Sequence, residues 1–331
     1  MEAVKNIKDI EKVKWDAFVK QHPQGTVFQT YEMCEVYWRT THNQPIAIAA
    51  VTDGEIRGVL LALLMWNGNG IAKMFTVRSV IIGGPLVQND DADVLKVLLR
   101  HYRKVLPIST IYSEIRPIYS MDSLASVLND EGFIRKGHLN LILDVSKDQQ
   151  VLWGGMHKER QRNVKHAEKN GLEYKEVVDK ESIDGIVDVI KRTYKRKRVP
   201  MADFDLFLNA REALGEYIEF FAAFYEGKII AGQIRLCYKD LVYAWFAGSD
   251  ENHFKLRPND FLMWNVICWA HDKGYKSFDF GGGGEPGKPY GVRDYKLKYG
   301  CQMFDYGRYL YYHRPLMYKI GEIGAKILIK R

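Results

Sequence analysis

The sequence predicts an α/β (α+β) fold built from two tandem domains, each a mainly antiparallel mixed sheet flanked by helices. With 331 residues, the chain is longer than one ordinary hydrophobic core requires. A similar order of strands, hairpin and helix also occurs twice, with hairpin turns at Asp53-Gly54 and Glu226-Gly227. The two turn glycines are 227 − 54 = 173 residues apart, and this spacing indicates an internal duplication.

The first domain is predicted to span residues 1–148. Its hairpin consists of strands 45–52 and 55–64, which flank the turn and are rich in apolar residues. Residues 90–106 repeat apolar side chains with the period of a helix. The other elements expected in this domain are strands over 74–87, 110–115 and 138–145 and a short helix over 121–129.

The second domain is predicted to span residues 149–314. Helices over 151–170 and 182–198 open it, and a third helix over 259–273 has one apolar face. Its sheet should repeat the hairpin and strand order of the first domain. The strands expected there are 217–225, 228–237, 241–248, 277–280 and 301–312.

Composition and charge narrow the function class. Hydrophobic residues make up 47% of the chain, which excludes an intrinsically disordered protein. The net charge of +7 favours anionic partners such as nucleic acid, nucleotide-linked substrates or an anionic membrane face, without selecting among them. The four cysteines lack metal-ligand spacing, so we expect no metal site, and buried free thiols fit a reducing compartment. We therefore predict a cytoplasmic protein.

One segment of the second domain combines backbone freedom with positive charge. A predicted strand ends in the run Gly281-Gly282-Gly283-Gly284. Successive glycines let a backbone open around a ligand, so we interpret this run as the floor of an active site. Lys296 and Lys298 follow, and because they are two residues apart we expect only Lys296 to enter the site. The alternative is a flexible surface loop with solvated lysines.

Two basic segments lie in predicted helices, at 157–169 and 191–198. A pair of such segments in one domain indicates a surface that contacts phosphate groups. Solvated helix faces would explain each segment equally well. The residues that we single out for contact with phosphate groups are Arg160, Arg162, Lys165 and Arg196.

The motifs that are absent exclude several enzyme classes. The sequence contains no Gly-x-Ser-x-Gly nucleophile elbow and no Walker loop. Acyl transfer to an amine needs only a proton acceptor and a charge that stabilises the oxyanion. Glu114 and Asp279 lie in or near strand ends and are candidate bases, and Lys296 is the candidate for the stabilising charge. Asp279 could instead hold the glycine run by accepting hydrogen bonds from its amides.

Several motifs together resemble one known family. They are the basic helix 162–172, the segment 247–250, and the strand 278–282 followed by Tyr295-Lys296. Tandem domains of this order resemble the GNAT-like acyltransferase fold as it is doubled in the FemABX family, whose members move amino acids from aminoacyl-tRNA onto peptidoglycan precursors. The resemblance implies that Tyr295 and Lys296 lie near the ester end of the donor and that Glu114 is a candidate base. It also implies that helix 315–331 packs back on the first domain.

The resemblance implies aminoacyl-tRNA as co-substrate and no bound cofactor. The turn over 254–260 supports this donor, because it has no glycine to cradle the pyrophosphate of coenzyme A. The acceptor would be a nucleotide-linked or lipid-linked cell-wall precursor, with peripheral contact of the protein with the inner membrane surface. Glu32 and Glu35 lie where a cation facing a diphosphate would be expected, which weakens the assignment of the acceptor.

Two other functions remain open at this point. The same fold could act as an N-acyltransferase on an amino sugar of a surface polysaccharide, with acyl-CoA or a carrier-bound acyl donor. The basic helices could instead belong to a non-catalytic RNA-binding protein, in which Lys296 has no part. The second of these leaves the glycine run without a purpose.

Overall fold

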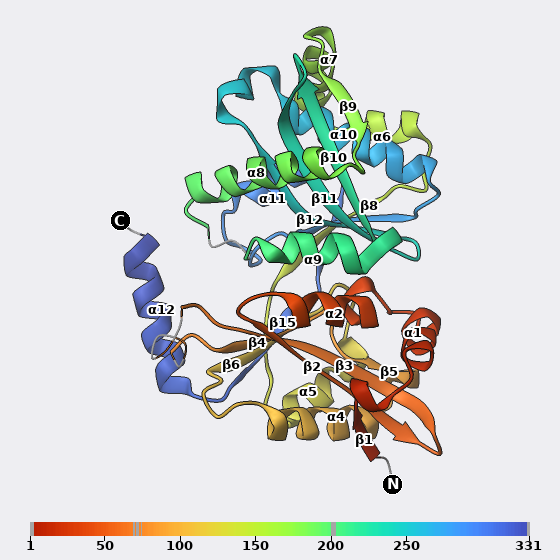
Figure 1. The fold of residues 1–331 in the computed structure, drawn as a ribbon, viewed down its shortest axis with the longest axis vertical. Helices are drawn as coiled ribbons and strands as arrows, with labels where there is room; N and C mark the ends of the chain where they lie inside the picture. The colour runs from red at the N-terminus through yellow and green to blue at the C-terminus, as the bar shows by residue number, and fades with distance from the viewer. Residues whose placement is uncertain (1–2, 69, 71–72, 74, 200–202, 330–331) are drawn as a thin grey trace. The chain divides into compact units, whose positions relative to one another are not determined.

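The computed structural model describes residues 3–329 except 69, 71, 72, 74 and 200–202, and the chain divides into two compact units (Figure 1). Unit 1 consists of Met1–His138 and Asp305–Arg331, and unit 2 consists of Leu139–Phe304. The divisions therefore fall at 138/139 and 304/305, where the sequence predicted 148/149 and 314/315. The difference arises from two strands that are described below.

Unit 1 has an eight-stranded sheet with the order β1-β2-β3-β4-β6-β15-β7, and β5 pairs with β3. Its strands are β1 (Ala3–Asn6), β2 (Asn43–Thr52), β3 (Glu55–Met65), β4 (Arg78–Ile82), β5 (Leu86–Val87), β6 (Tyr112–Arg116), β7 (Ile134–Lys136) and β15 (Arg308–Tyr312). Its α-helices are α1 (Lys12–Gln21), α2 (Tyr31–Arg39), α4 (Ala92–Val105), α5 (Ala125–Asp130) and α12 (Pro315–Ile329). Helices α1 and α2 cover one face of the sheet, and α4 and α5 cover the other (Figure 1).

Strands β2 and β3 form the centre of unit 1, because most of their side chains are apolar and buried. Helix α4 begins at Asp91, whose carboxylate accepts hydrogen bonds from the amides of Asp93 and Val94. The buried side chains of α4 recur at helical spacing and pack in the same core as β2 and β3. They are Val94, Leu95, Leu98, Leu99 and Tyr102.

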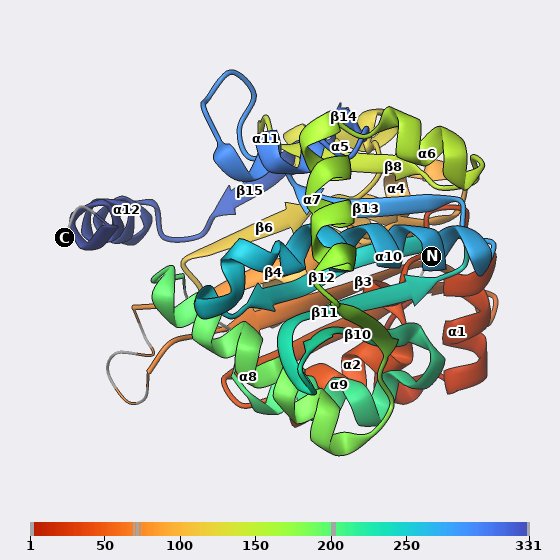
Figure 2. The same cartoon turned by 90° about the horizontal axis from the view of Figure 1, so that it is seen from above.

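Unit 2 has a seven-stranded sheet with the order β14-β8-β13-β12-β11-β10-β9. Its strands are β8 (Leu139–Asp144), β9 (Glu173–Glu176), β10 (Ile218–Tyr225), β11 (Lys228–Tyr238), β12 (Leu241–Ser249), β13 (Ser277–Gly282) and β14 (Gln302–Asp305). Its α-helices are α6 (Gln149–Gly155), α7 (Lys158–Lys169), α8 (Lys180–Arg196), α9 (Asp205–Leu214), α10 (Pro258–Asp272) and α11 (Gly291–Leu297). Helices α8 and α10 lie on opposite faces of the sheet (Figure 2).

Helix α8 packs unusually close to strands β11 and β12, because glycines face it. A Cβ added to Gly232 would lie 2.7 Å from Ile186, and one added to Gly248 would lie 2.6 Å from the Cα of Ile190. Thr193, near the end of α8, also donates a hydrogen bond of 3.1 Å to the carbonyl of Ser249. These contacts hold the C-terminal end of α8 against the edge of a cavity that is described below.

The two sheets repeat one strand order, which confirms the predicted tandem fold. Reading from β1 in unit 1 and from β9 in unit 2, hairpins β2-β3 and β10-β11 are followed by β4 and β12 and then by the parallel strands β6 and β13. Both hairpin turns have two residues with positive φ: Asp53 (52°) and Gly54 (82°) in the first, Glu226 (49°) and Gly227 (73°) in the second. This is the backbone that two-residue hairpins favour.

Two strands belong to the other sheet from the one predicted. Residues 138–145 were expected to close the first domain, but β8 pairs with β13 of unit 2. Residues 301–312 were expected as one strand of the second domain, but the chain turns at Gly307, with φ of 70°, and β15 pairs with β6 of unit 1. Strands that are consecutive in the chain usually lie next to each other in a sheet. Here β15, from the C-terminal segment of unit 1, completes the first sheet, and β8, from the start of unit 2, pairs with the distant β13.

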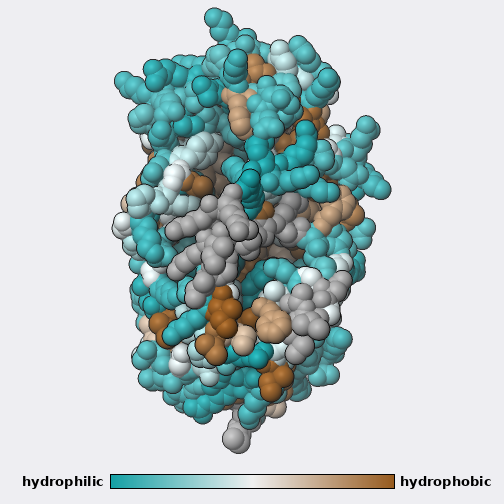
Figure 3. Space-filling model, turned by 90° about the vertical axis from the view of Figure 1, so that its left-hand side faces the viewer, coloured by the Kyte–Doolittle hydropathy of each residue, from teal (hydrophilic) through white to brown (hydrophobic). Residues whose placement is uncertain are grey.

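Helix α12 belongs to unit 1, where the ring of Tyr318 packs against Tyr112 and Tyr312 at centroid distances of 5.2 and 4.5 Å. Leu316 and Ile320 of the same helix remain 68% and 55% exposed. The side chains beyond residue 322 lie outside the described part. Some apolar side chains interrupt the mainly hydrophilic face in Figure 3. Among the described residues, no helix has the length and apolar character needed to cross a bilayer.

Candidate active site

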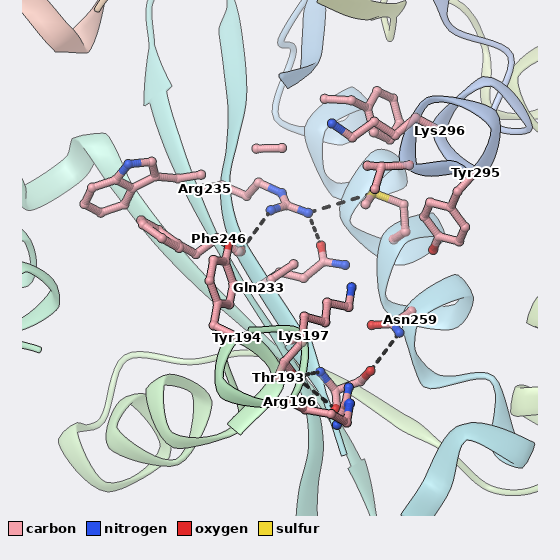
Figure 4. A pocket seen from close by; sticks show the side chains of 18 of the residues that line it. Thr193, Tyr194, Arg196, Lys197, Gln233, Arg235, Phe246, Asn259, Tyr295 and Lys296 are labelled. Atoms are coloured by element: carbon pink, nitrogen blue, oxygen red, sulfur yellow. Dashed lines mark hydrogen bonds between the residues drawn. The ribbon is translucent and has the colours of Figure 1, made fainter. Parts of the chain in front are cut away.

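A cavity of about 480 Å³ opens in unit 2 where two parallel strands separate. Strands β12 and β13 pair from Leu241 opposite Ser277 to Tyr243 opposite Asp279, and no later pair joins the described residues of the two strands. The cavity is lined by residues of β11, β12, β13, α10, α11 and the end of α8 (Figure 4). Clefts at the point where strands diverge are common ligand sites in α/β proteins.

One wall of this cavity is aromatic. Tyr194 of α8 packs against Phe246 of β12 with ring centroids 5.8 Å apart, and Trp245 packs against Phe246 at 5.0 Å. A β-bulge brings both β12 aromatics together, because the register between β11 and β12 shifts by one residue at Trp245. Tyr295 faces this wall from α11 (Figure 4). Such a wall can hold a nucleobase or an acyl chain.

Lys296, which the sequence singled out, lines this cavity together with Lys197. Nζ of Lys296 donates a 2.9 Å hydrogen bond to the carbonyl of Gly282. Burial lowers the pKa of Lys296 to about 8, and the nearby Asp279 carboxylate opposes part of that shift. Lys298 instead forms an ion pair with Glu159 at 2.6 Å. Only one of the two lysines therefore enters the cavity, as expected from their spacing.

Asp279 holds the glycine run. It is 1% exposed, and its carboxylate accepts hydrogen bonds from the amide of Gly281 at 2.6 Å and from Nδ2 of Asn140 at 3.3 Å. Burial raises the pKa of Asp279 to about 6, although these bonds and the charge of Lys296 act in the opposite direction. This is the loop-bonding role that the sequence left as an alternative to a base.

The glycines support the cavity from behind and do not line it. Gly281 has φ of 75°, which only glycine adopts without strain. A Cβ on Gly283 would lie 3.1 Å from Leu141, so this glycine permits close packing on β8. The neighbouring Phe280 lines the cavity, whereas Gly281, Gly282 and Gly283 are not among its lining residues. The predicted glycine floor is therefore the end of β13 and the start of the loop after it, and the carbonyl of Gly282 accepts the hydrogen bond from Lys296.

Tyr295 and Arg160 meet at a buried carboxylate. Asp260, in the first turn of α10, is 4% exposed, and it accepts hydrogen bonds from Nη1 of Arg160 at 2.6 and 2.8 Å. Tyr295 donates to the same carboxylate at 3.1 Å, and the guanidinium of Arg160 lies 4.8 Å from the centroid of its ring. Tyr299 adds a further bond of 2.7 Å. This geometry favours a positioning role for Arg160 over the predicted contact with phosphate.

The other three predicted cations occupy different places. Arg196 lines the cavity, stacks on Phe254 at 5.0 Å and lies 3.4 Å from Glu251. Arg162 and Lys165 are exposed on α7, and neither is among the lining residues of the cavity. The structure therefore brings one of the four predicted phosphate-binding residues, together with Tyr295 and Lys296, into a single site.

Glu114 lies in unit 1, in strand β6. Its buried carboxylate forms ion pairs with Arg116 at 2.6 Å and with Arg308 at 2.9 Å. These two arginines hold the pKa of Glu114 below its usual range, although burial alone would raise it. A carboxylate held ionised in this way is a weak proton acceptor. The environment therefore argues against the predicted role of Glu114 as a base.

Metal ligands do not gather in the described part of the chain, where no group of three or more His, Cys, Asp or Glu side chains could hold an ion. The cysteines are free thiols, and Cys34, Cys237 and Cys301 are buried. Burial raises the pKa of each of these three thiols. They are therefore poor nucleophiles at neutral pH.

Comparison with known proteins agrees with this fold. The model of the acetyltransferase (GNAT) domain family matches residues 156–297, the part of unit 2 that contains the cavity. The lipid II:glycine glycyltransferase of Staphylococcus haemolyticus is 25% identical over 224 residues, which cover 63% of this chain and 52% of that protein. The chain spans about half the length of the curated relatives that it matches.

Solved structures extend the similarity over nearly the whole chain. The crystal structure of FemX superposes with a TM-score of 0.74 at 18% identity and covers 94% of this chain and 98% of its own. A tandem GNAT protein from the clavulanic acid biosynthesis pathway superposes with a TM-score of 0.59 at 10% identity, over 95% of this chain and 99% of its own. The chain is therefore similar to FemABX-type proteins, and it has a tandem GNAT-like fold.

Sequence reasoning missed two polar residues of the cavity. Gln233 and Arg235 of β11 both line it and are 2% and 1% exposed. They alternate with apolar residues, and this pattern is also typical of a strand with one solvated face. Asp260 was missed as well, because its partner Arg160 is 100 residues away in the sequence. A carboxylate followed by an apolar helix usually signals only a helix start.

Proposed function

We propose that the protein is an acyltransferase that moves an aminoacyl group from aminoacyl-tRNA to an amine of a cell-wall precursor. The observation that carries this proposal is the partly buried amine of Lys296 at an aromatic-walled cavity where two strands separate. The curated relatives are named as lipid II:glycine glycyltransferases, and this activity supports the type of reaction and the class of acceptor.

The reaction needs little covalent chemistry from the protein. The free amine of the acceptor attacks the carbonyl carbon of the aminoacyl ester, and a C–N bond forms. The C–O bond to the ribose then breaks, and the proton that the amine loses ends on the ribose oxygen. The ammonium form of Lys296 stabilises the oxyanion that develops on the carbonyl, and Asp279 and the glycine run hold Lys296 in place.

The start of α10 supports a donor other than acyl-CoA. Helix N-termini bind pyrophosphate through free amides, and glycine-rich turns bring the phosphates close. Here Pro258 removes one amide, Arg257 adopts φ of 60° before it, and the carboxylate of Asp260 already occupies the first turn. The aromatic wall formed by Tyr194 and Phe246 can instead stack the terminal base of a tRNA.

We place the reaction on the cytoplasmic side of the membrane, where aminoacyl-tRNA is found. The acceptor can be linked to a nucleotide or to a lipid. The exposed Leu316 and Ile320 of α12 support peripheral contact with the membrane surface during use of a lipid-linked acceptor. Such contact would bring unit 1 to the headgroups without a spanning helix.

A transfer assay tests the donor and the acceptor separately. Radiolabelled aminoacyl-tRNA and radiolabelled acetyl-CoA are each offered with lipid II or with the UDP-linked precursor, and labelled product is separated. We expect label from aminoacyl-tRNA in at least one precursor and none from acetyl-CoA. Binding of tRNA without transfer to any amine would contradict the proposal and favour an RNA-binding protein.

A second candidate function is supported by the family model. The GNAT domain that matches residues 156–297 carries the description of an acetyltransferase, which favours an N-acyltransferase acting on an amino sugar. Label transferred from acetyl-CoA to a glucosamine acceptor in the same assay would select this function and remove the first.

A further inference from the structure

The cavity contains a second buried cation that the proposed transfer does not use. Nη1 of Arg235 donates to the carbonyls of Ile234 at 3.2 Å and Phe246 at 3.4 Å. Nη2 donates to Oε1 of Gln233 and lies 3.8 Å from Sδ of Met263. The guanidinium lies between the aromatic wall and α11 (Figure 4). All of these partners are neutral.

The charge of Arg235 is not balanced within unit 2. In the part of the chain that the structure describes, no carboxylate pairs with Arg235, and its Nε has no hydrogen-bond partner. Burial lowers the pKa of Arg235 to about 9, so the side chain stays a cation at neutral pH. Arg160, the other buried arginine of unit 2, has the carboxylate of Asp260. Burying a charge without a partner costs free energy that a ligand can recover.

The rest of the cavity is also positive. Among the described residues that line it, the ionisable side chains other than tyrosine are Arg196, Lys197, Arg235 and Lys296, and none is acidic. Arg235 and Lys296 are close enough for the charge of Arg235 to disfavour the ammonium form of Lys296. An anion placed between them would remove this repulsion and satisfy both cations.

We propose that the floor of the cavity binds an oxyanion, a carboxylate or a phosphate, through Arg235 beside Lys296, and that the ligand carries such a group. Gln233 is the exchangeable partner, because its side chain also lines the cavity and its rotation would free Nη2 for a ligand oxygen. The guanidinium can then hold two oxygens of one group. The inference deepens the proposed function and rests on it only for the reaction, since anion binding requires no transfer.

The two sources of an oxyanion are separated by matched pairs of small probes. AMP against adenosine tests the phosphate, and N-acetylglycine against N-acetylglycinamide tests the carboxylate. Titration calorimetry on the full chain should show that the charged member of one pair binds at least about tenfold tighter than its neutral twin. The pair that responds identifies the source. Equal affinities within both pairs would overturn the proposal.

Variants assign the effect to Arg235. Arg235→Met should abolish the preference for the charged probe, because it removes the cation and leaves an apolar chain of similar length. Its midpoint of thermal unfolding without ligand should equal or exceed that of the wild type, because an unpaired buried charge is lost. If Arg235→Met has a lower midpoint of thermal unfolding and still prefers the charged probe, Arg235 only stabilises the β-bulge. This result would overturn the proposal.

Two further variants keep the test decisive. Arg235→Lys retains the charge but not the planar fork, so its preference should be intermediate, and this variant serves if Arg235→Met does not fold. Arg211→Gln removes a partly exposed cation from α9 of the same unit, outside the residues that line the cavity, and should bind like the wild type. If transfer fails in every assay while the charged probe still depends on Arg235, the proposed reaction is wrong and the anion site stands. If the protein transfers the aminoacyl group but Arg235→Met keeps the preference for the charged probe, only the proposed anion site is wrong.

Discussion

Glu114 in unit 1 and Asp279 in unit 2 occupy matching positions, and their surroundings differ. Each lies in the third pair of a parallel ladder, Glu114 opposite Val80 and Asp279 opposite Tyr243. In unit 1 two arginines neutralise the carboxylate and lower its pKa. In unit 2 the carboxylate faces an amide, an asparagine and one lysine, and burial raises its pKa to about 6. The same strand position therefore holds a carboxylate paired with two arginines in unit 1 and a buried carboxylate with a raised pKa in unit 2.

The parallel strands themselves differ in the same way. In unit 1, β4 and β6 remain paired over five positions, from Arg78 opposite Tyr112 to Ile82 opposite Arg116. In unit 2, the equivalent strands pair over three positions and then separate at the cavity. A duplicated scaffold can therefore keep one copy closed for stability and open the other for a ligand.

Removal of Lys296 should have the largest effect. Lys296→Ala should lower the transfer rate by about 10²- to 10³-fold, as expected for loss of one group that stabilises an oxyanion. The fold should be kept, because a partly buried amine is removed. The measurement is kcat for aminoacyl transfer, with far-ultraviolet circular dichroism as the check on folding.

Lys298→Ala is the matched control, because Lys298 pairs with Glu159 and leaves the cavity lysine in place. If Lys296→Ala transferred aminoacyl groups at the wild-type rate, the cavity of unit 2 would not be the active site. Lys296→Arg should restore part of the rate and extend activity to higher pH. The pKa of Lys296 is about 8, so the wild-type rate should fall above that pH as the ammonium loses its proton.

The paired carboxylates should differ in stability. Glu114→Gln leaves Arg116 and Arg308 without a counter-charge and should cost about 3 kcal/mol at neutral pH. Asp279→Asn keeps an oxygen for the amide of Gly281 and should cost less than about 1 kcal/mol. Hydrogen exchange of the backbone amides of β6 and β13 measures each unit separately. Equal losses in the two variants would contradict the comparison between the units.

Lowering the pH should stabilise the protein through Asp279 of unit 2 and destabilise it through Glu114 of unit 1. The folded pKa of Asp279 is raised from 3.8 to about 6, so the folded state takes up a proton first. Its contribution of about 3 kcal/mol is present below pH 4 and is lost as the pH rises through 6. The folded pKa of Glu114 is lowered, so its contribution is present above 4.5 and is lost on further acidification.

Denaturant midpoints of the wild type and Asp279→Asn between pH 4 and 7 measure the contribution of Asp279 to stability. The wild type should gain stability relative to the variant as the pH falls from 7 to 4. A difference between the two that does not change with pH would show that Asp279 stays ionised throughout. Glu114→Gln should show the reverse dependence, which makes it the control for general acid effects.

Much of the fold followed from local patterns. The hairpin turns at Gly54 and Gly227 need positive φ, and glycine next to an acidic residue is a local signal for that backbone. The spacing of Lys296 and Lys298 was enough to predict that one lysine enters the site, because side-chain direction follows from the local backbone. The strand order repeated at a fixed separation was enough for the tandem fold.

The exchanged strands and the partners of buried charges did not follow from such patterns. Residues 138–145 and 308–312 have the composition of strands wherever they pair, so the sequence alone did not assign their sheets. Arg160 was predicted from its basic helix, yet its partner Asp260 lies on another helix.

The sequence by itself determined the two hairpins, the duplication and the different directions of Lys296 and Lys298, since these follow from local patterns in the chain. The tertiary structure alone decided that Glu114 is neutralised, that the glycine run supports the cavity from behind, and that Arg235 lies unpaired at its floor. The physical reason is that the energy of a buried charge depends on every group within a few ångströms, and those groups come from distant parts of the chain.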